Sequence, residues 1–286
     1  MPFIQKKIAL RSILTAIFTS CCCYADGILN PKGIIATDER KLLFDAISLM
    51  LIIVIPVISM SFVFAYRFRS TKRRGEYKPD WHDDILLETF WWAIPGLIIL
   101  ILSILVWKKT HSLDPYQEIK VEAEKETIEV VALSWKWLFL YPKEGVATIN
   151  DLHIPVNKQV EFHITADAPM SSFAIPQLVG QIYAMAGMRT RLHMYTENIG
   201  VYEGLNTQLN GEGYSQMHFK THVVSNDDFN IWVYKNKLSN KPLTLSKYAG
   251  LYKPSIAAPP VYFSSYPNNL FMDIIKQYNK KNSWLH

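Results

Sequence analysis

All three cysteines of this chain are consecutive and stand near its start, at Cys21, Cys22 and Cys23. They follow a basic, acid-free beginning and an apolar run, Ser12 to Phe18, which is typical of a secretory signal and too short to span a bilayer. A cysteine directly after such a signal is the acylated residue of a lipoprotein. We therefore predict a lipoprotein-type signal over residues 1–20 with Cys21 as the acceptor; Cys22, Cys23 or a signal with incidental cysteines are alternatives. No cysteine is left for a disulfide framework or a thiolate metal site elsewhere.

A second candidate for chemistry is Glu88, which stands just before a long apolar stretch in the run Leu-Glu-Thr-Phe-Trp-Trp-Ala-Ile-Pro. A carboxylate at the edge of a membrane helix can collect protons from water and pass them inward. The sequence therefore makes Glu88 a candidate for proton uptake. The alternative is a boundary acid that lipid headgroups solvate.

The spacing of the histidines gives no indication of a metal site. His218 and His222 lie four positions apart on a predicted strand, which separates them by about 13 Å, too far for one ion. His153, His163 and His193 are scattered through the same region. We expect these histidines to face solvent or to be satisfied within the fold.

The composition points to two different kinds of segment in one chain. The 286 residues are 49% hydrophobic and only 19% charged, with a net charge of +5. These values exclude a disordered, collagen-like or small disulfide-stapled protein. The mean hydropathy of +0.04 is too low for a polytopic membrane protein and high for a soluble one. An average of this kind indicates apolar membrane segments joined to an ordinary domain.

Two apolar stretches are long enough to cross a bilayer, since a helix rises 1.5 Å per residue. Residues 46–66 and 89–107 contain no charged side chain. Pro56 and Pro95 lie inside them, which membrane helices tolerate. We predict transmembrane helices over residues 42–66 and 86–107.

The connecting segment, residues 67–85, sets the expected orientation. Between positions 67 and 78 several arginines and lysines face a single acid, Glu76. A short basic loop stays in the cytoplasm, so residues 21–41 and everything after the second span are expected in the periplasm. The positive net charge is thus a topology signal, and no nucleic-acid partner is predicted.

The remainder of the chain has the pattern of an all-β domain. Alternating or β-rich segments occur at residues 126–133, 158–165, 188–196 and 217–224, with glycine and proline between them. Short strands at this spacing predict a sandwich or barrel over residues 108–224.

Residues 225–286 form a distinct C-terminal part. Residues 227–238 have acids at the start and lysines near the end, as a helix would. The tail from residue 253 is rich in proline and aromatic residues and ends in a short helical stretch near residues 270–278. We expect this tail to be an arm that packs on a partner protein.

Several runs in the β region resemble subunit II of the haem–copper terminal oxidases. They are Ser-Trp-Lys-Trp-Leu-Phe with Trp135 and Trp137, Met-Ser-Ser-Phe-Ala-Ile-Pro at residues 170–176, and Gly-Val-Tyr-Glu-Gly-Leu-Asn at residues 200–206. The resemblance covers nearly the whole chain after the signal. It implies a two-helix transmembrane hairpin followed by an all-β cupredoxin-like sandwich or barrel and a short helical C-terminal arm.

In the cytochrome c oxidases of that superfamily this domain binds a binuclear copper centre. The family pattern is a His in a His-Ser-Phe run and, 35 positions on, Cys-x-Glu-x-Cys-x3-His-x2-Met. The corresponding positions in this chain are Ser171, Asn206, Gln208, Asn210, Tyr214 and Met217. Only the methionine is retained, and a hydroxyl, amides and a phenol do not replace thiolates and imidazoles as copper ligands. The resemblance therefore implies a vestigial site without metal, in which Met217 is a core residue.

Loss of the copper ligands is typical of the quinol-oxidising branch. The run Gln-Ile-Tyr-Ala-Met-Ala-Gly-Met-Arg-Thr-Arg-Leu at residues 181–192 and Pro-Lys-Gly at residues 31–33 resemble cytochrome bo-type ubiquinol oxidases. What this implies is a bacterial inner-membrane subunit that binds no cofactor and supports subunit I. There the haems, copper and ubiquinone would reduce O2 to water with proton pumping. Subunits I, III and IV, membrane lipid and, through the complex, ubiquinol would be the partners.

The same resemblance implies a role for Glu88, because the family has Glu, Trp, Thr and Pro at this place and the Glu is implicated in a proton-pathway entrance shared with subunit I. Ala93 stands where Thr is common. Two other functions agree less well with the sequence. A copper-bearing cytochrome c oxidase subunit is disfavoured by the missing ligands. A stand-alone membrane-anchored β-domain that binds other molecules explains neither the retained spacing nor the surroundings of Glu88.

Overall fold

The computed structural model describes residues 27–69 and 84–282 and divides the chain into two compact units. Of these residues, one unit comprises 38–69 and 84–117, and the other comprises 27–37 together with 118–282. The three cysteines and most of the basic loop lie outside the described residues.

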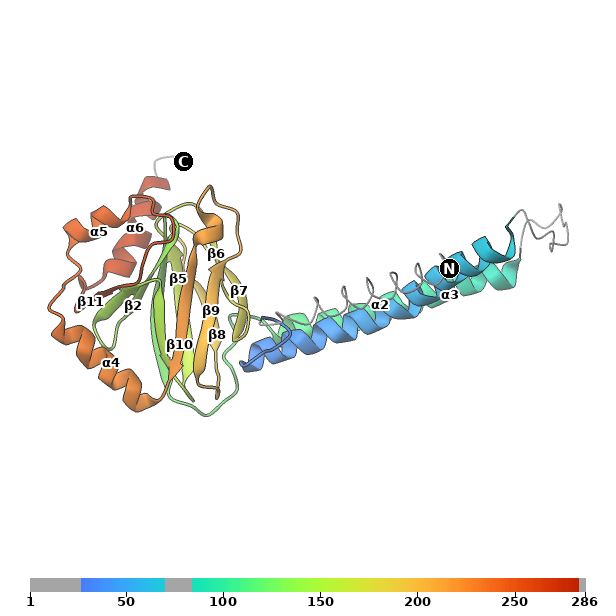
Figure 1. Ribbon diagram of the computed structural model, residues 1–286, viewed down its shortest axis with the longest axis horizontal. Helices are drawn as coiled ribbons and strands as arrows, with labels where there is room; N and C mark the ends of the chain where they lie inside the picture. Colours follow the sequence, from blue (N-terminus) through green and yellow to red (C-terminus); the bar gives the residue numbers. More distant parts are fainter. Residues whose placement is uncertain (1–26, 70–83, 283–286) are drawn as a thin grey trace, which may run out of the picture. The chain divides into compact units, whose positions relative to one another are not determined.

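The first unit consists of two long helices, α2 (Ile34–Arg67) and α3 (Ile85–Ser112) (Figure 1). They include the stretches 42–66 and 86–107 and extend beyond both. Asp84 caps α3, because its carboxylate accepts hydrogen bonds from the backbone N–H groups of Leu86 and Leu87 at 3.0 and 3.2 Å. Large apolar side chains are exposed all round, as Phe62 and Trp92 at 74% show. Both helices are long and apolar enough to cross a membrane.

The second unit is a sandwich of two sheets (Figure 1). Its strands are β1 (Lys125–Leu133), β2 (Lys136–Tyr141), β3 (Val146–Ile149), β4 (Asp151–Pro155), β5 (Gln159–Ala166), β6 (Ser171–Ile175), β7 (Val179–Ala184), β8 (Thr190–Met194), β9 (Gly200–Asn206), β10 (His218–Val224) and β11 (Val261–Phe263). One sheet has the order β11-β3-β2-β1-β5-β8 and the other the order β4-β10-β9-β6-β7. The four strands predicted from the alternating pattern are therefore confirmed as β1, β5, β8 and β10.

Aromatic rings from both sheets form the centre of the sandwich. Trp137 and Phe139 of the first sheet contact Phe173 and Phe219 of the second, with ring centroids 5.1 to 6.4 Å apart. All four side chains are at most 3% exposed. Aromatic pairs of this kind contribute about 0.5–1.5 kcal/mol each beyond the burial of their area.

A single residue, Asn150, carries the chain from the first sheet to the second. It separates β3 from β4 and has a φ of 54°, a left-handed conformation that asparagine tolerates well. Its side chain accepts a hydrogen bond from the Trp137 backbone N–H at 2.8 Å and donates to the carbonyl of Ala258 at 2.9 Å. The beginning of β4 is thereby fixed against both the core and the C-terminal segment.

Part of the C-terminal segment, from Leu243 onwards, covers the outer face of the first sheet. The whole segment contains α4 (Asn226–Leu238), α5 (Leu245–Leu251), β11 and α6 (Leu270–Asn282), so the predicted helix over residues 227–238 is confirmed. Apolar side chains of this segment pack on those of β1, β2 and β3: Leu243, Tyr248, Phe263, Leu270, Phe271, Ile274 and Ile275. This side of the tail therefore packs on the chain itself, and the expectation that the tail packs on a partner stays a prediction for its outer surface. The outward residues of β1 and β2 are apolar and need a cover, which the chain itself supplies.

Candidate functional site

The six positions that correspond to the family's copper ligands lie at one end of the five-stranded sheet, and we call them the ligand-position lobe: Ser171, Asn206, Gln208, Asn210, Tyr214 and Met217. Ser171 begins β6, Asn206 ends β9 and Met217 precedes β10. Strand pairing places Asn206 opposite Phe173, and the Asn206 N–H donates to the Met217 carbonyl at 3.1 Å. The fold therefore brings the ends of these strands together as the spacing predicts.

Hydrogen bonds of side-chain amides connect the residues of this lobe. The Asn206 side-chain oxygen accepts from the backbone N–H groups of Ser172 and Gln208 at 2.8 and 3.1 Å, and its NH2 group donates to the Gln208 carbonyl at 2.9 Å. The Asn210 NH2 group donates to the Ser171 hydroxyl at 2.8 Å. The side-chain oxygens of Asn206 and Ser171 thus already accept hydrogen bonds from protein groups, and the NH2 groups are donors, which are not metal ligands.

Met217 and Tyr214 differ in their burial. Met217 is fully buried and packs in the aromatic core, whereas the Tyr214 side chain is 37% exposed in a short 3-10 turn (Tyr214–Gln216). Met217 is thus a core residue, as expected. Among the side chains of the lobe, hydroxyl, amide, phenol and thioether groups occur, but neither thiolate nor imidazole. This donor set does not fit a copper centre.

Trp135 closes the lobe from one side. Its Nε1–H donates to the carbonyl of Asn210 at 3.3 Å, and its own φ is 62°. The indole packs on Gly213, where an added Cβ would lie 2.4 Å from Trp135 Cδ2. Only glycine fits at this position. Trp135 and Trp137 therefore have packing roles in this chain, Trp137 within the core and Trp135 under the loop.

Glu88 lies in the first turn of α3 and is exposed. Its backbone N–H donates to the Asp84 carbonyl at 2.9 Å. A carboxylate in the first turn is stabilised by the helix dipole. An apolar groove between α2 and α3 is lined by its neighbours Leu87, Phe90 and Trp91. The residue belongs to the helical unit.

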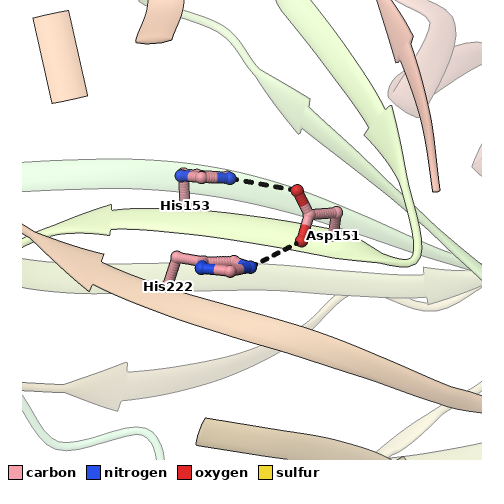
Figure 2. Close-up of side chains that lie close together, drawn as sticks. All are labelled: Asp151, His153 and His222. Carbon is pink, nitrogen blue, oxygen red and sulfur yellow. Dashed lines mark hydrogen bonds and ion pairs between the residues drawn. The ribbon is translucent and has the colours of Figure 1, made fainter. Parts of the chain in front are cut away.

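A group that the sequence analysis missed lies on β4 and β10: Asp151, His153 and His222, which we call the carboxylate–histidine cluster (Figure 2). Asp151 and His153 share one face of β4 because side chains alternate along a strand. The parallel pairing of β4 with β10 places His222 directly opposite His153. The Asp-x-His spacing is the sequence signal that could have drawn attention to β4, but nothing in the sequence shows that His222 is its neighbour.

Both imidazoles of the cluster point at the same carboxylate. His153 Nε2 lies 3.0 Å from Asp151 Oδ2, and His222 Nε2 lies 3.0 Å from Asp151 Oδ1. The two rings are stacked, with centroids 4.6 Å apart and an interplanar angle of 9°. The side chain of Asp151 is 4% exposed, that of His153 14% and that of His222 27%. The cluster is therefore open to solvent on the side of His222.

Burial and hydrogen bonding compete at these groups. Burial alone would raise the pKa of Asp151, but hydrogen bonds from His153 and Tyr262 and the nearby histidines outweigh it, so the pKa lies below its usual value. Burial lowers the pKa of His222. An ionised carboxylate beside a neutral imidazole is the state that these directions favour near neutral pH.

Two other histidines have separate partners. His163 Nε2 lies 2.9 Å from Glu161, and His218 Nδ1 lies 2.9 Å from Glu203. His163 and His218 are thus satisfied within the fold, as expected, and so are His153 and His222, through Asp151; the proximity of these last two is what the sequence did not predict. The reason is the β4–β10 pairing, which joins residues far apart in the sequence.

Comparisons with known proteins agree with this architecture. Residues 127–224 match the family described as "Cytochrome C oxidase subunit II, periplasmic domain", and residues 237–282 match "COX Aromatic Rich Motif". The chain is 45% identical over 251 residues to "Cytochrome bo(3) ubiquinol oxidase subunit 2" of Pseudomonas aeruginosa, covering 88% of this chain and 76% of that protein. It is 42% identical over 275 residues to "Ubiquinol oxidase subunit 2" of Acetobacter aceti, covering 96% and 89%.

Among solved structures, the periplasmic domain of cytochrome oxidase subunit II of Bradyrhizobium japonicum is similar, with 23% identity and a TM-score of 0.40, covering 42% of this chain and 99% of that one. Two apolar helices followed by a periplasmic cupredoxin-like sandwich and C-terminal helices define a membrane-bound subunit II of the terminal oxidases. Within that class the chain belongs to the ubiquinol oxidase subunit II family. As such it is one subunit of an oxidase complex that contains further subunits.

Proposed function

We propose that this chain is a copper-free subunit II, which caps and supports the catalytic subunit of a proton-pumping ubiquinol oxidase in the bacterial inner membrane. The observation that carries the proposal is the ligand-position lobe, where amide hydrogen bonds of Asn206 and Asn210 stand in place of metal ligation. An oxidase that takes electrons from a membrane-soluble quinol needs no copper relay on this domain. The haems, the copper and the quinol site then belong to subunit I.

Purification in mild detergent tests this proposal. The complex is expected to contain haem and about one copper, and the isolated subunit II is expected to contain none. The matched measurement is copper analysis of the separated chain before and after incubation with excess copper and dialysis. Retained copper that is lost in a Met217→Leu variant would favour the alternative, an electron-transferring copper subunit. A chain that purifies without any haem-bearing partner would instead support a stand-alone β-domain.

The proposal extends to proton uptake at Glu88. Its position in the first turn of α3, exposed and beside an apolar groove between the two helices, supports a carboxylate that receives protons at the membrane edge. Glu88→Gln keeps the size and removes the charge, so we expect slower oxygen consumption in complexes that assemble normally. Glu88→Asp keeps the carboxylate and is expected to retain most of the rate. Equal rates for the glutamine variant and the wild type would refute this role.

The proposed topology places residues 67–85 in the cytoplasm and both chain ends in the periplasm, with a lipid on Cys21, Cys22 or Cys23. The basic composition of the loop supports this orientation. Radiolabelled fatty acid is expected to enter the chain and to be lost in Cys21→Ser if that residue is the acceptor. Label that persists when all three cysteines are replaced would contradict lipidation at this place.

A further inference from the structure

We propose that the carboxylate–histidine cluster is a binding site for a divalent transition metal ion such as Zn²⁺. Among the described residues, it is the group of three histidine and carboxylate side chains whose ligand atoms all lie within 4.8 Å of one another (Figure 2). Both Nε2 atoms face Asp151 from adjacent strands, each at 3.0 Å from one of its oxygens. Ligands of a tetrahedral zinc ion lie about 3.3 Å apart at bond lengths of about 2.0–2.1 Å. Two of the ligand pairs are therefore already close to the separation that an ion requires.

The ligand side chains are held in place by neighbours. Trp232 of α4 stacks on His153, with centroids 4.3 Å apart and an interplanar angle of 18°. The Tyr262 hydroxyl of β11 donates to Asp151 Oδ2 at 2.6 Å. Hydrogen bonds to a ligating carboxylate and packing of a ligating ring are the supports that fix metal ligands in proteins. Two of the three ligands are thus preorganised, and His222, the most exposed, can move toward the ion.

The chemistry of the donors selects the ion. Two imidazoles and one carboxylate suit zinc and its neighbours, whereas Ca²⁺ and Mg²⁺ prefer oxygen ligands only. One negative charge partly neutralises the dication, and the exposed side of His222 leaves room for water as a further ligand. Metal binding at His153 Nε2 requires the imidazole proton at Nδ1, which is buried and has no hydrogen-bond partner among the described residues, so this ligand carries a desolvation cost that lowers the affinity.

A second carboxylate–histidine pair in the sandwich lacks a third ligand and differs from the cluster in this respect. Glu161 and His163 on β5 have the same carboxylate-x-His spacing, and their side chains lie 2.9 Å apart. Opposite His163 on β8, however, stands Arg191, a permanent cation. At the cluster, the residue opposite His153 is a second histidine. The cross-strand partner therefore decides which pair can hold a cation.

Zinc titration of the detergent-solubilised full chain, with a chromophoric chelator as competitor, tests the site. We expect about one zinc per chain in the wild type. His222→Ala and His153→Ala should each weaken zinc affinity at least tenfold, and His163→Ala should leave it unchanged. Cobalt, used as a visible probe, should give an absorption band in the wild type and in His163→Ala that is lost in His222→Ala.

Folding is checked by circular dichroism, and His222→Gln serves as a second variant because the side chain is partly exposed and glutamine preserves its bulk. Zinc is also expected to raise the Tm of the wild type and not that of His222→Gln, since a ligand that binds only the native state stabilises it. Failure of the folded wild type to bind zinc overturns the site. Zinc binding that is unchanged in His153→Ala and His222→Ala overturns it equally.

Discussion

The ligand-position lobe and the carboxylate–histidine cluster lie in the same sandwich, and each has only one of two features of a metal site. The lobe keeps the sequence spacing of a family metal site, but its side chains are amides and hydroxyls that bond to one another and to backbone. The cluster has the donors of a metal site without any such spacing. The spacing of residues in the sequence therefore indicates where the fold brings side chains together, whereas the residue types decide what those side chains can bind.

The two regions also differ in what they contribute to the fold. Asn206 is 4% exposed and satisfies buried backbone groups, so the lobe is part of the structure of the domain. The cluster is partly exposed and joins β4 and β10 to the C-terminal segment through Tyr262 and Trp232. Substitutions in the lobe should therefore cost more stability than substitutions in the cluster.

The largest effect is expected for Asn206→Ala. It removes three hydrogen bonds and leaves the buried N–H of Ser172 without its acceptor, which should lower the free energy of unfolding of the sandwich by about 3 kcal/mol. Thermal unfolding of the full chain, followed by near-UV circular dichroism, measures the loss. Gln208→Ala is the control, because Gln208 bonds to Asn206 through its backbone. Equal Tm values for both variants would show that the three hydrogen bonds of the Asn206 side chain do not stabilise the sandwich.

Gly213→Ala should come next, with a loss of about 2 kcal/mol from overpacking, because the new Cβ would lie 2.4 Å from the Trp135 indole. Gly250→Ala is the matched control, since an added Cβ there meets nothing within 4 Å. Its change should lie within about 1 kcal/mol and be neutral or stabilising, since alanine favours helix. The double variant with Trp135→Ala should lose less than the sum of the single changes. Strict additivity would mean that the two residues do not press on each other.

A smaller effect is expected in the cluster for Tyr262→Phe. It removes the hydroxyl that donates to Asp151 at 2.6 Å and should cost about 1 kcal/mol, felt mainly as faster amide exchange in β11 and β3. Tyr234→Phe, at a tyrosine that is 64% exposed, is the control and should change neither strand. If amide exchange becomes faster throughout the sandwich instead, the cluster contributes to the stability of the whole domain, as the lobe does.

The smallest change in stability, within about 0.5 kcal/mol, is expected for Arg191→His, whose side chain is 45% exposed. This substitution places a histidine opposite His163 and so imitates the cross-strand pair of the cluster. We expect a second, weaker zinc equivalent that disappears when His163→Ala is added. Arg191→Gln, which removes the cation without adding a ligand, should bind no second zinc. A second equivalent in the glutamine variant would mean that removing the cation is sufficient.

Local pattern was enough for much of the fold. The apolar stretches at residues 46–66 and 89–107 could only be long helices, and alternation identified β1, β5, β8 and β10. The acidic start and basic end of residues 227–238 likewise indicated α4. These features depend on side chains a few positions apart, so they can be predicted from the sequence.

The site could be predicted only where a known spacing existed. The six positions of the lobe follow from the family pattern, and their residue types already exclude thiolate and imidazole ligation. The packing of the C-terminal segment on its own sheet was not predictable, because the apolar outer faces of β1 and β2 are visible only once the first sheet is assembled. An aromatic tail fits a partner's surface and the chain's own equally well in sequence.

Local sequence sets which segments are apolar, where the strands alternate and which chemical groups the positions of the ligand-position lobe hold. The tertiary structure alone decided that His153 lies opposite His222, because parallel pairing of β4 with β10 joins strands that are distant along the chain. A shift of that register by one residue would turn one histidine to the other face of the sheet and dissolve the cluster. Register is set by how the whole sandwich packs, and no local pattern encodes it.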